Sequence, residues 1–215
     1  MSFLSYLISG ISLGSIYAII ALGYTMVYGI ARMLNFAHGD IIMVGAFAVF
    51  TMVSTLGMAP LVGIAAAVVV CTLLGVTIEF VAYRPLRGAS SLAVLITAIG
   101  VSYLLQNLAL LIFGSNARQF TSVVTVPGLK LAGGRLSISG ETIVTIVVCI
   151  VIMASLTAFI NKTRIGQAML AVSEDRGAAT LMGINVNKTI AITFAIGSAL
   201  AAIAGALLCS TYPSL

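Results

Sequence analysis

Long apolar stretches separated by short polar segments dominate the pattern of hydrophobic and polar positions along this chain. Uncharged runs cover residues 1–31, 41–78, 88–117, 142–161 and 189–215. A helix that crosses a bilayer needs about 20 apolar residues. The pattern therefore predicts an all-α, polytopic transmembrane helical bundle that forms a single domain over residues 1–215. Its six spans are expected at about 7–30, 40–56, 61–83, 91–113, 142–160 and 189–208.

Composition supports a membrane protein. Hydrophobic residues make up 61% of the chain and charged residues 7%, whereas soluble domains carry about 25% charged residues. A chain with so few charged residues cannot cover the surface of a water-soluble globule of this length. The net charge of +5 is therefore attributed to basic residues gathered on one side of a lipid bilayer, and we expect no nucleic-acid partner.

The basic residues predict the orientation. If the spans alternate, one side holds seven of them and the other side holds three. The positive-inside rule places the larger set in the cytoplasm, with the N-terminus outside, residues 114–141 as an external loop and residues 161–188 as a cytoplasmic loop. The larger set is Arg32, Arg84, Arg87, Lys162, Arg164, Arg176 and Lys188, and the smaller set is Arg118, Lys130 and Arg135. Within the external loop, residues 121–126 alternate weakly, so a small hairpin is possible there.

Small residues recur at four-residue spacing in three of the predicted spans, which favours close helix packing. The three stripes are Gly10, Gly14 and Ala18; Gly63, Ala67, Cys71, Gly75 and Glu79; and Gly197, Ala201 and Gly205. Glu79 ends the second stripe, and we expect it to pair with Arg84 or Arg87 or to reach the membrane interface.

Motifs for catalysis are missing from the sequence. His38 is the only histidine, there is no HExxH sequence, and no Gly-rich loop precedes a Lys-Ser/Thr pair. The three cysteines show no metal or redox spacing. The sequence therefore predicts a protein that is not an enzyme and that needs no metal or cofactor.

A polar stretch between the first two spans gives candidates for a translocation pathway. Asn35, His38, Gly39 and Asp40 lie next to the bilayer, and polar groups at membrane depth usually line a cavity or pathway. Gly39 permits a broken helix, and Asn35 or Asp40 is suited to cap the helix that follows. The free N–H groups of such a helix suit a substrate carboxylate. The alternative is a plain cytoplasmic turn in which Asp40 is only a cap.

Two further polar residues lie in the fourth predicted span. Gln106 and Asn107 are expected to form interhelical hydrogen bonds, and contact with a transported solute is the second possibility for them.

The segment 161–188 contains the one amphipathic pattern in a long polar run. Leu170, Ala171, Ala178, Leu181 and Met182 recur at helical spacing, and a glycine follows at position 183, where a helix is expected to stop. We interpret the segment as a short cytoplasmic helix that docks into a partner protein. An ordinary solvated loop is the alternative.

Two segments resemble a known family. Residues 10–47, GISLGSIYAIIALGYTMVYGIARMLNFAHGDIIMVGAF, and residues 173–208, SEDRGAATLMGINVNKTIAITFAIGSALAAIAGALL, resemble the permease subunits of branched-chain amino-acid ABC importers. The resemblance implies inward transport across the bacterial cytoplasmic (inner) membrane, powered by separate subunits. The implied partners are a second, homologous permease subunit, two cytoplasmic ABC ATPases and an external solute-binding protein.

The resemblance also implies a coupling element. ABC permeases carry a cytoplasmic Glu-Ala-Ala-x-x-x-Gly sequence that docks into a groove of the ATPase. Residues 177–183, GAATLMG, align with it, with Gly177 in place of the glutamate. Coupling to the ATPase is thereby assigned to Gly177, Ala178, Ala179 and Gly183, and the neighbouring Glu174, Asp175 and Arg176 are expected to supply polar contacts.

Other functions stay open at this stage. Urea or short-chain amide ABC permeases share the same scaffold motifs. A carrier or channel working alone would need carboxylates at mid-bilayer, where only Glu79 comes close. A non-catalytic scaffold subunit is a third option. Members of the resembling family continue with further spans, so we expect this chain to be C-terminally shortened relative to them.

Overall fold

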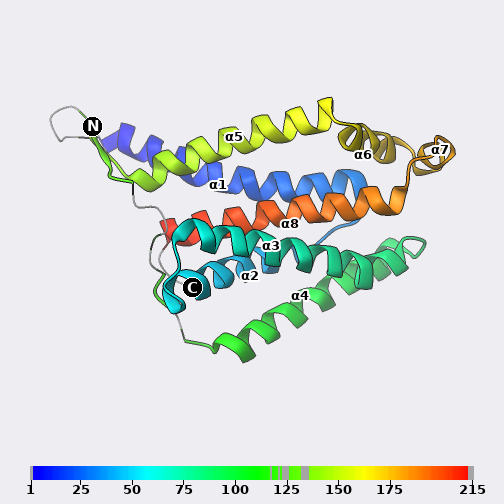
Figure 1. Cartoon of the computed structure of the whole chain (residues 1–215), viewed down its shortest axis with the longest axis horizontal. Helices are drawn as coiled ribbons and strands as arrows, with labels where there is room; N and C mark the ends of the chain where they lie inside the picture. Colours follow the sequence, from blue (N-terminus) through cyan, green and yellow to red (C-terminus); the bar gives the residue numbers. More distant parts are fainter. Residues whose placement is uncertain (1, 117, 121, 123–125, 132–135, 213–215) are drawn as a thin grey trace.

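The computed structural model describes residues 2–116, 118–120, 122, 126–131 and 136–212. Long helices run side by side in it, and a pair of short helices lies at one end of the bundle (Figure 1). The helices are α1 (Ser2–Ala31), α2 (His38–Phe50), α3 (Pro60–Ile78), α4 (Ser91–Phe113), α5 (Gly140–Lys162), α6 (Arg164–Glu174), α7 (Arg176–Leu181) and α8 (Val186–Thr211). Two π-helical turns extend α2 and α3, namely η1 (Thr51–Thr55) and η2 (Glu79–Tyr83), and a 3-10 turn, η3 (Arg84–Leu86), follows η2.

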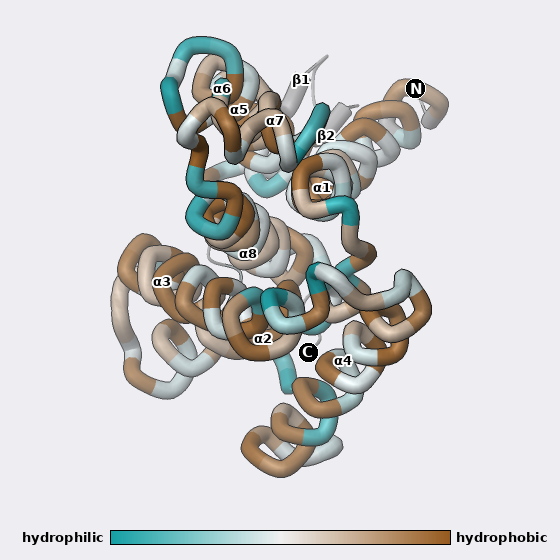
Figure 2. Tube along the Cα trace, turned by 90° about the vertical axis from the view of Figure 1, so that its right-hand side faces the viewer, coloured by the Kyte–Doolittle hydropathy of each residue, from teal (hydrophilic) through white to brown (hydrophobic). Residues whose placement is uncertain are grey.

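All six predicted spans are confirmed as helices that are long and apolar enough to cross a membrane. They are Tyr6–Ala31, His38–Thr55, Pro60–Leu86, Ser91–Phe113, Gly140–Lys162 and Val186–Thr211. Hydrophilic residues gather on α6, α7 and the connecting loops, while the long helices are mainly apolar (Figure 2). A helix that is apolar all round buries itself in lipid or in protein, so this distribution is that of a polytopic membrane protein.

Helix α8 lies at the centre of the bundle and contacts α1, α2 and α3. Its stripe of Gly197, Ala201 and Gly205 is buried, as is the α3 stripe that ends at Gly75 and Glu79. A Cβ atom at Gly205 would lie 2.6 Å from the carbonyl oxygen of Ile42 in α2. A Cβ atom at Gly75 would overlap the side chain of Ser198 in α8. The predicted close packing is therefore confirmed for these two stripes.

The stripe in α1 behaves differently. Gly10 and Gly14 are exposed, and a Cβ atom at either position would meet nothing within 4 Å. Helix α1 instead packs on its neighbours through the face that carries Ser12, Ile16 and Ile19. The predicted close approach of another helix at Gly10 and Gly14 is thus not made within the described part of this chain.

A two-stranded antiparallel hairpin precedes α5. It pairs β1 (Leu129–Leu131) with β2 (Leu136–Ile138), and Leu129 lies opposite Ile138. The hairpin expected at residues 121–126 falls mostly on residues that lie outside the described ones. The strands that are described occur further along the same segment.

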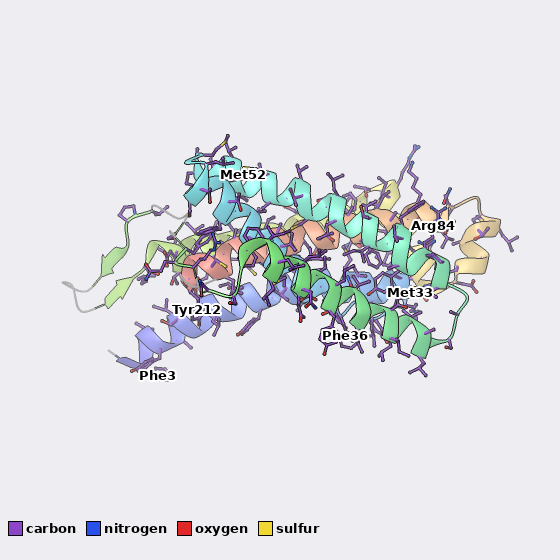
Figure 3. All side chains as sticks on the ribbon, turned by 90° about the horizontal axis from the view of Figure 1, so that it is seen from below. Phe3, Met33, Phe36, Met52, Arg84 and Tyr212 are labelled. Carbon is purple, nitrogen blue, oxygen red and sulfur yellow. The ribbon has the colours of Figure 1, made fainter. Side chains whose placement is uncertain are left out.

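Helix α2 begins inside the bundle. The backbone leaves α1 at Arg32, which has a φ of 51°, and residues 32–37 run back between the helices as non-helical chain. Phe36 accordingly lies between the two ends of the bundle (Figure 3). His38 packs beside Gly23, eight residues before the end of α1, which corresponds to a depth of about 12 Å at 1.5 Å per residue. The returning segment 32–37 is the reason that α2 starts at this depth.

Candidate functional site

The predicted docking segment, residues 161–188, contains two short helices, α6 and α7, whereas its pattern predicted one short helix. Asp175 separates α6 from α7 with an extended backbone, φ −148° and ψ 116°. Its carboxylate accepts a hydrogen bond of 3.0 Å from the N–H of Ala178 and so caps α7. An Asp side chain that bonds to the following backbone favours a helix start over helix continuation. The helix break at Asp175 is a feature that the sequence pattern did not indicate, and the short helix expected around residues 177–183 corresponds to α7.

The end of α7 is as expected. Gly183 has a φ of +81°, a conformation that glycine adopts without steric cost. Its N–H donates to the carbonyl of Thr180, and the N–H of Ile184 donates to the carbonyl of Ala179, both at 3.0 Å. These two bonds form a Schellman motif. The prediction that the helix stops at Gly183 is confirmed.

Helix α6 is anchored to the end of α5. The Thr163 hydroxyl accepts a 3.0 Å hydrogen bond from the N–H of Gly166, and a Cβ atom at Gly166 would collide with the backbone of Ile160. Met169 and Val172 are buried against the bundle. The α6–α7 pair is therefore fixed to the long helices and follows their movement.

The residues assigned to coupling take different positions. Glu174, Gly177 and Ala178 are exposed, Ala179 is buried, and Asp175 is used as the cap of α7. The Arg176 guanidinium donates to the carbonyl of Ala31 at the end of α1. Asp175 and Arg176 thus hold α7 in place by bonds within the chain, and Glu174 remains exposed.

Two large apolar residues at the end of α7, which were not assigned to the site, are highly exposed. Leu181 is 89% exposed and Met182 is 82% exposed. They lie at the end of the bundle that carries the seven basic residues, which we call the basic end, beyond the long spans (Figure 1). The signal in the sequence was two apolar residues directly before a helix-ending glycine. Their exposure leaves an apolar surface on α7 that no described part of the chain covers.

Arginines surround the base of α7. Arg32 donates to the carbonyl of Ser173 at 2.6 Å, and Arg87 pairs with Glu79, which is 2% exposed, and with Asn187. The predicted pairing of Glu79 with one of the two neighbouring arginines is therefore seen. Burial lowers the pKa of the Arg87 guanidinium, and the Glu79 carboxylate opposes that shift.

The Arg176 guanidinium lies in a similar environment. Burial lowers its pKa, and the positive charge of Arg32 lowers it further. Both arginines keep their charge at neutral pH because an arginine normally has a pKa far above neutrality. Positive charge is therefore concentrated at the base of α7.

The pathway candidates fall into two groups. Asn35 accepts a 3.1 Å hydrogen bond from the hydroxyl of Tyr83, and both residues are buried. Asp40, which is 8% exposed, accepts a 3.0 Å hydrogen bond from the Gln106 amide in α4. The Asp40–Gln106 bond is an interhelical one of the kind expected for span four. Asn107 instead bonds to the carbonyl of Tyr103 in its own helix, at 2.7 Å.

His38 lies on the α1 side of this region. Its ring packs edge-on against Tyr24, with centroids 6.0 Å apart, and it shares a hydrogen bond with the backbone of Ile20. The Nε2 atom is buried without a hydrogen-bond partner. His38 and Asn35 are thus directed into the bundle, away from the exposed Gln106.

The start of α2 leaves polar backbone groups open. Ala37 occupies the N-cap position, and no side chain caps the helix, so neither Asn35 nor Asp40 has the expected capping role. Gly39 is exposed, and the space around it is empty to 4 Å. The first N–H groups of a helix carry partial positive charge. The structure therefore presents a helix N-terminus at depth, beside the Asp40–Gln106 pair.

These features define a class of protein: a multi-pass helical membrane protein, with six candidate spans among its described residues and an amphipathic helix pair fixed at one end. Among the described residues, no group of three or more His, Cys, Asp or Glu side chains is placed to hold a metal ion. The family model for the branched-chain amino acid transport system permease component matches residues 6–214. The chain therefore belongs to that family of permease components.

Individual relatives agree with the family. The branched-chain amino acid transport permease BraD of Pseudomonas aeruginosa is 42% identical, over 98% of this chain and 72% of its own length. LivH of Escherichia coli is 40% identical over 98% of this chain and 71% of its own. A probable LivH of Methanocaldococcus jannaschii is 28% identical over 88% and 61%. No solved structure matches the chain.

Proposed function

We propose that this chain is the membrane-embedded permease subunit of an ABC importer that moves branched-chain amino acids inward. The family match over nearly the whole chain carries the proposal, and two relatives that are 40–42% identical bear the name of high-affinity branched-chain amino acid permeases. ATP hydrolysis takes place in two separate ABC ATPases. A second, homologous permease and an external solute-binding protein complete the importer in the bacterial cytoplasmic membrane.

The basic end of the bundle is the cytoplasmic end in this proposal, and the N-terminus lies outside. Seven basic residues support that orientation through the positive-inside rule. It directs α7 toward the ATPases. Leu181 and Met182 are then the apolar contacts that enter an ATPase groove, and Glu174 is the adjacent polar contact, because all three are exposed.

Movement of the ATPases reaches the spans through α7 in three ways. Arg176 ties α7 to the end of α1, the Schellman turn at Gly183 leads within a few residues into α8, and α6 continues into α5. A rigid-body shift of these elements opens one face of the pathway as it closes the other.

The pathway passes the N-terminus of α2 in this proposal. Gly39 gives access to the open N–H groups, which suit the carboxylate of an amino acid. Gln106 and Asn107 are exposed on the neighbouring α4. Asp40 holds Gln106 in place, and Asn35 and His38 fix the returning segment from the side of α3 and α1.

The coupling proposal is tested with reconstituted importer containing this chain, its partner permease, the ATPases and the binding protein. The double variant is L181Q/M182Q. Leu181 and Met182 are both highly exposed, so we expect the variant chain to fold as the unaltered chain does. A fully buried Leu or Met contributes about 1.5–3 kcal/mol, so ATPase affinity is expected to fall at least about a hundredfold. ATP-driven leucine uptake and ATPase stimulation are measured.

The matched control is L181M/M182L, which keeps the apolar surface and is expected to transport normally. Full uptake by L181Q/M182Q would remove α7 from the coupling mechanism. Leucine flux in vesicles that contain no ATPase would instead indicate a carrier. Uptake of urea or acetamide in preference to leucine would indicate the amide-permease alternative.

A further inference from the structure

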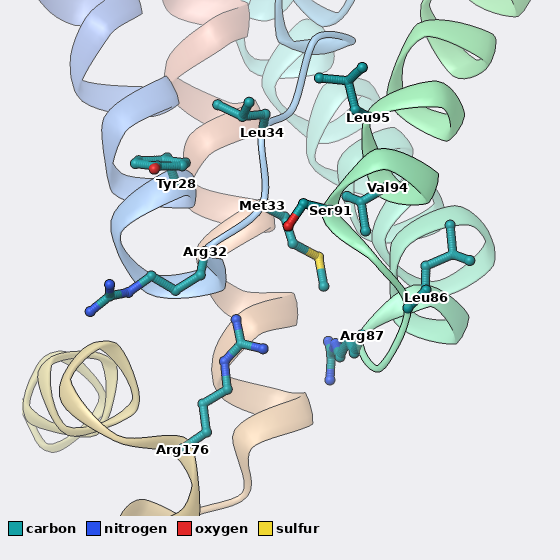
Figure 4. Close-up of a pocket in the computed structure, with 11 residues that line it drawn as sticks. Tyr28, Arg32, Met33, Leu34, Leu86, Arg87, Ser91, Val94, Leu95 and Arg176 are labelled. Atoms are coloured by element: carbon teal, nitrogen blue, oxygen red, sulfur yellow. The ribbon is translucent and has the colours of Figure 1, made fainter.

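A cavity of about 350 Å³ lies at the basic end of the bundle. It is enclosed by the end of α1, the returning segment, the start of α4 and the base of α7 (Figure 4). Arg32, Arg87 and Arg176 line it, and no acidic residue is among its lining residues. Neither Asp40 nor Gln106 is among its lining residues.

The charges of these arginines are not balanced within the described part of the chain. Glu79 pairs with Arg87, but Arg32 and Arg176 donate only to backbone carbonyls of α6 and α1. The Nε atom of Arg87 is buried and has no hydrogen-bond partner. Guanidinium groups that repel one another in a partly buried site are stabilised by an anion.

The opposite wall of the cavity is apolar. It is formed by Leu34, Val94 and Leu95, with Met33 between this wall and the arginines. In Figure 4, Leu34 and Leu95 lie on one side of the cavity and the guanidinium groups of Arg87 and Arg176 lie on the other. Leu95 lies further into the α4 span than Ser91, the first residue of α4. The lining therefore combines a cationic outer part with a hydrocarbon inner part.

We propose that this cavity binds the phosphate group of an anionic phospholipid, held by Arg87 and Arg176 with Arg32 at the rim, and with an acyl chain along Leu34 and Leu95. Arginine suits phosphate because its planar group donates two parallel hydrogen bonds. Ser91 in the first turn of α4 adds the positive end of a helix dipole. Basic pockets between spans are known to take lipid headgroups.

The position of the site gives the lipid a structural effect. Arg176 is the first residue of α7, and Arg87 precedes α4. A phosphate bonded to both arginines joins α7 to the α3–α4 turn, in addition to the bond from Arg176 to Ala31 of α1 and the bond from Arg87 to Asn187 of α8. Bound lipid is therefore expected to stabilise the base of α7 against the bundle.

The test uses the full chain, purified in detergent and freed of lipid. Native mass spectrometry and thermal unfolding are measured with added phosphatidylglycerol, with phosphatidylcholine and with inorganic phosphate. Phosphatidylglycerol should remain bound and raise the Tm, and the neutral lipid should do neither. Binding of inorganic phosphate with no preference for phosphatidylglycerol would overturn the lipid assignment, since the site would then take a free anion.

The double variant R32Q/R176Q is expected to bind phosphatidylglycerol at least about tenfold more weakly, because it removes charged hydrogen-bond donors at the cavity, each of which contributes roughly tenfold. Its matched control is K162Q/R164Q, which removes two positive charges from exposed positions at the same end and should bind as the unaltered chain does.

A second variant keeps the proposal testable if the first does not fold. Ser91→Glu places a carboxylate in the cavity at an exposed first-turn position, where an acidic residue favours the helix. It should fold normally and lose phosphatidylglycerol binding. Equal lipid affinity for S91E and the unaltered chain would overturn the proposal, as would equal affinity for R32Q/R176Q and K162Q/R164Q.

Discussion

Replacement of Gly205 by alanine tests the packing on which the whole arrangement depends. A Cβ atom there would lie 2.6 Å from the carbonyl oxygen of Ile42 and 3.3 Å from the backbone N of Ala46. Ordinary contact begins at 3.4 Å, so α8 and α2 must separate by roughly 0.8 Å. Both obstacles are backbone atoms, which no side-chain rotation removes. Overpacking of this kind costs about 1–3 kcal/mol.

Gly14→Ala is the matched control, because a Cβ atom at Gly14 meets nothing within 4 Å. Both changes gain the same helix propensity, roughly 1 kcal/mol for alanine over glycine, so the difference between the two variants isolates the clash. At about 2–4 °C per kcal/mol for a chain of this length, G205A should unfold roughly 2–12 °C below G14A.

The assay is thermal unfolding of the two variants of the isolated chain in the same detergent, followed by circular dichroism. Equal Tm values for G205A and G14A would refute the reasoning, because α8 would then not lie against α2 at the described distance. The contact also supports the N-terminal half of α2, so a lower Tm is expected to accompany lower transport in the assembled importer.

Three further predictions concern polar contacts. Asp175→Ala removes the cap of α7 and should cost about 1 kcal/mol, seen as faster amide hydrogen exchange within α7, whereas unchanged exchange would contradict the capping role. Glu79→Gln leaves the partly buried Arg87 without its counterion and should destabilise the chain by about 1.5–3 kcal/mol, measured as a lower Tm; an unchanged Tm would show that the pair is not formed. Asp40→Ala releases Gln106 and should abolish leucine uptake with the protein level unchanged, and normal uptake at a normal level would exclude a pathway role for the pair.

The fold could be predicted from the sequence to the level of its spans. The fourth predicted span, 91–113, coincides with α4, and the others differ from the helices by a few residues at their ends. The buried faces of α3 and α8 were also predicted, because a glycine stripe records how closely another helix must approach. The same signal was misleading at Gly10 and Gly14, where nothing in the described chain approaches.

The candidate site was predictable only in part. The stop at Gly183 followed from a local conformational need, but the break at Asp175 did not, because the amphipathic pattern continues across it. The sequence pattern placed Leu181 and Met182 on the apolar face of a helix, but it did not show that the other helices of the chain leave these two residues exposed. Each of these features depends on which parts of the folded chain pack against the residue, and the local sequence does not contain that information.

By itself, the sequence determined that the chain enters a membrane, how many times it can cross, which end is basic and which family it resembles. Those properties depend on apolar length, charge count and short motifs, all of which are local along the chain. Only the tertiary structure decided that α2 starts at depth, that Asp40 meets Gln106 66 positions away, and that three arginines share one cavity. Such contacts are set by the rotation and depth of whole helices, and uniformly apolar helices carry almost no sequence signal for either.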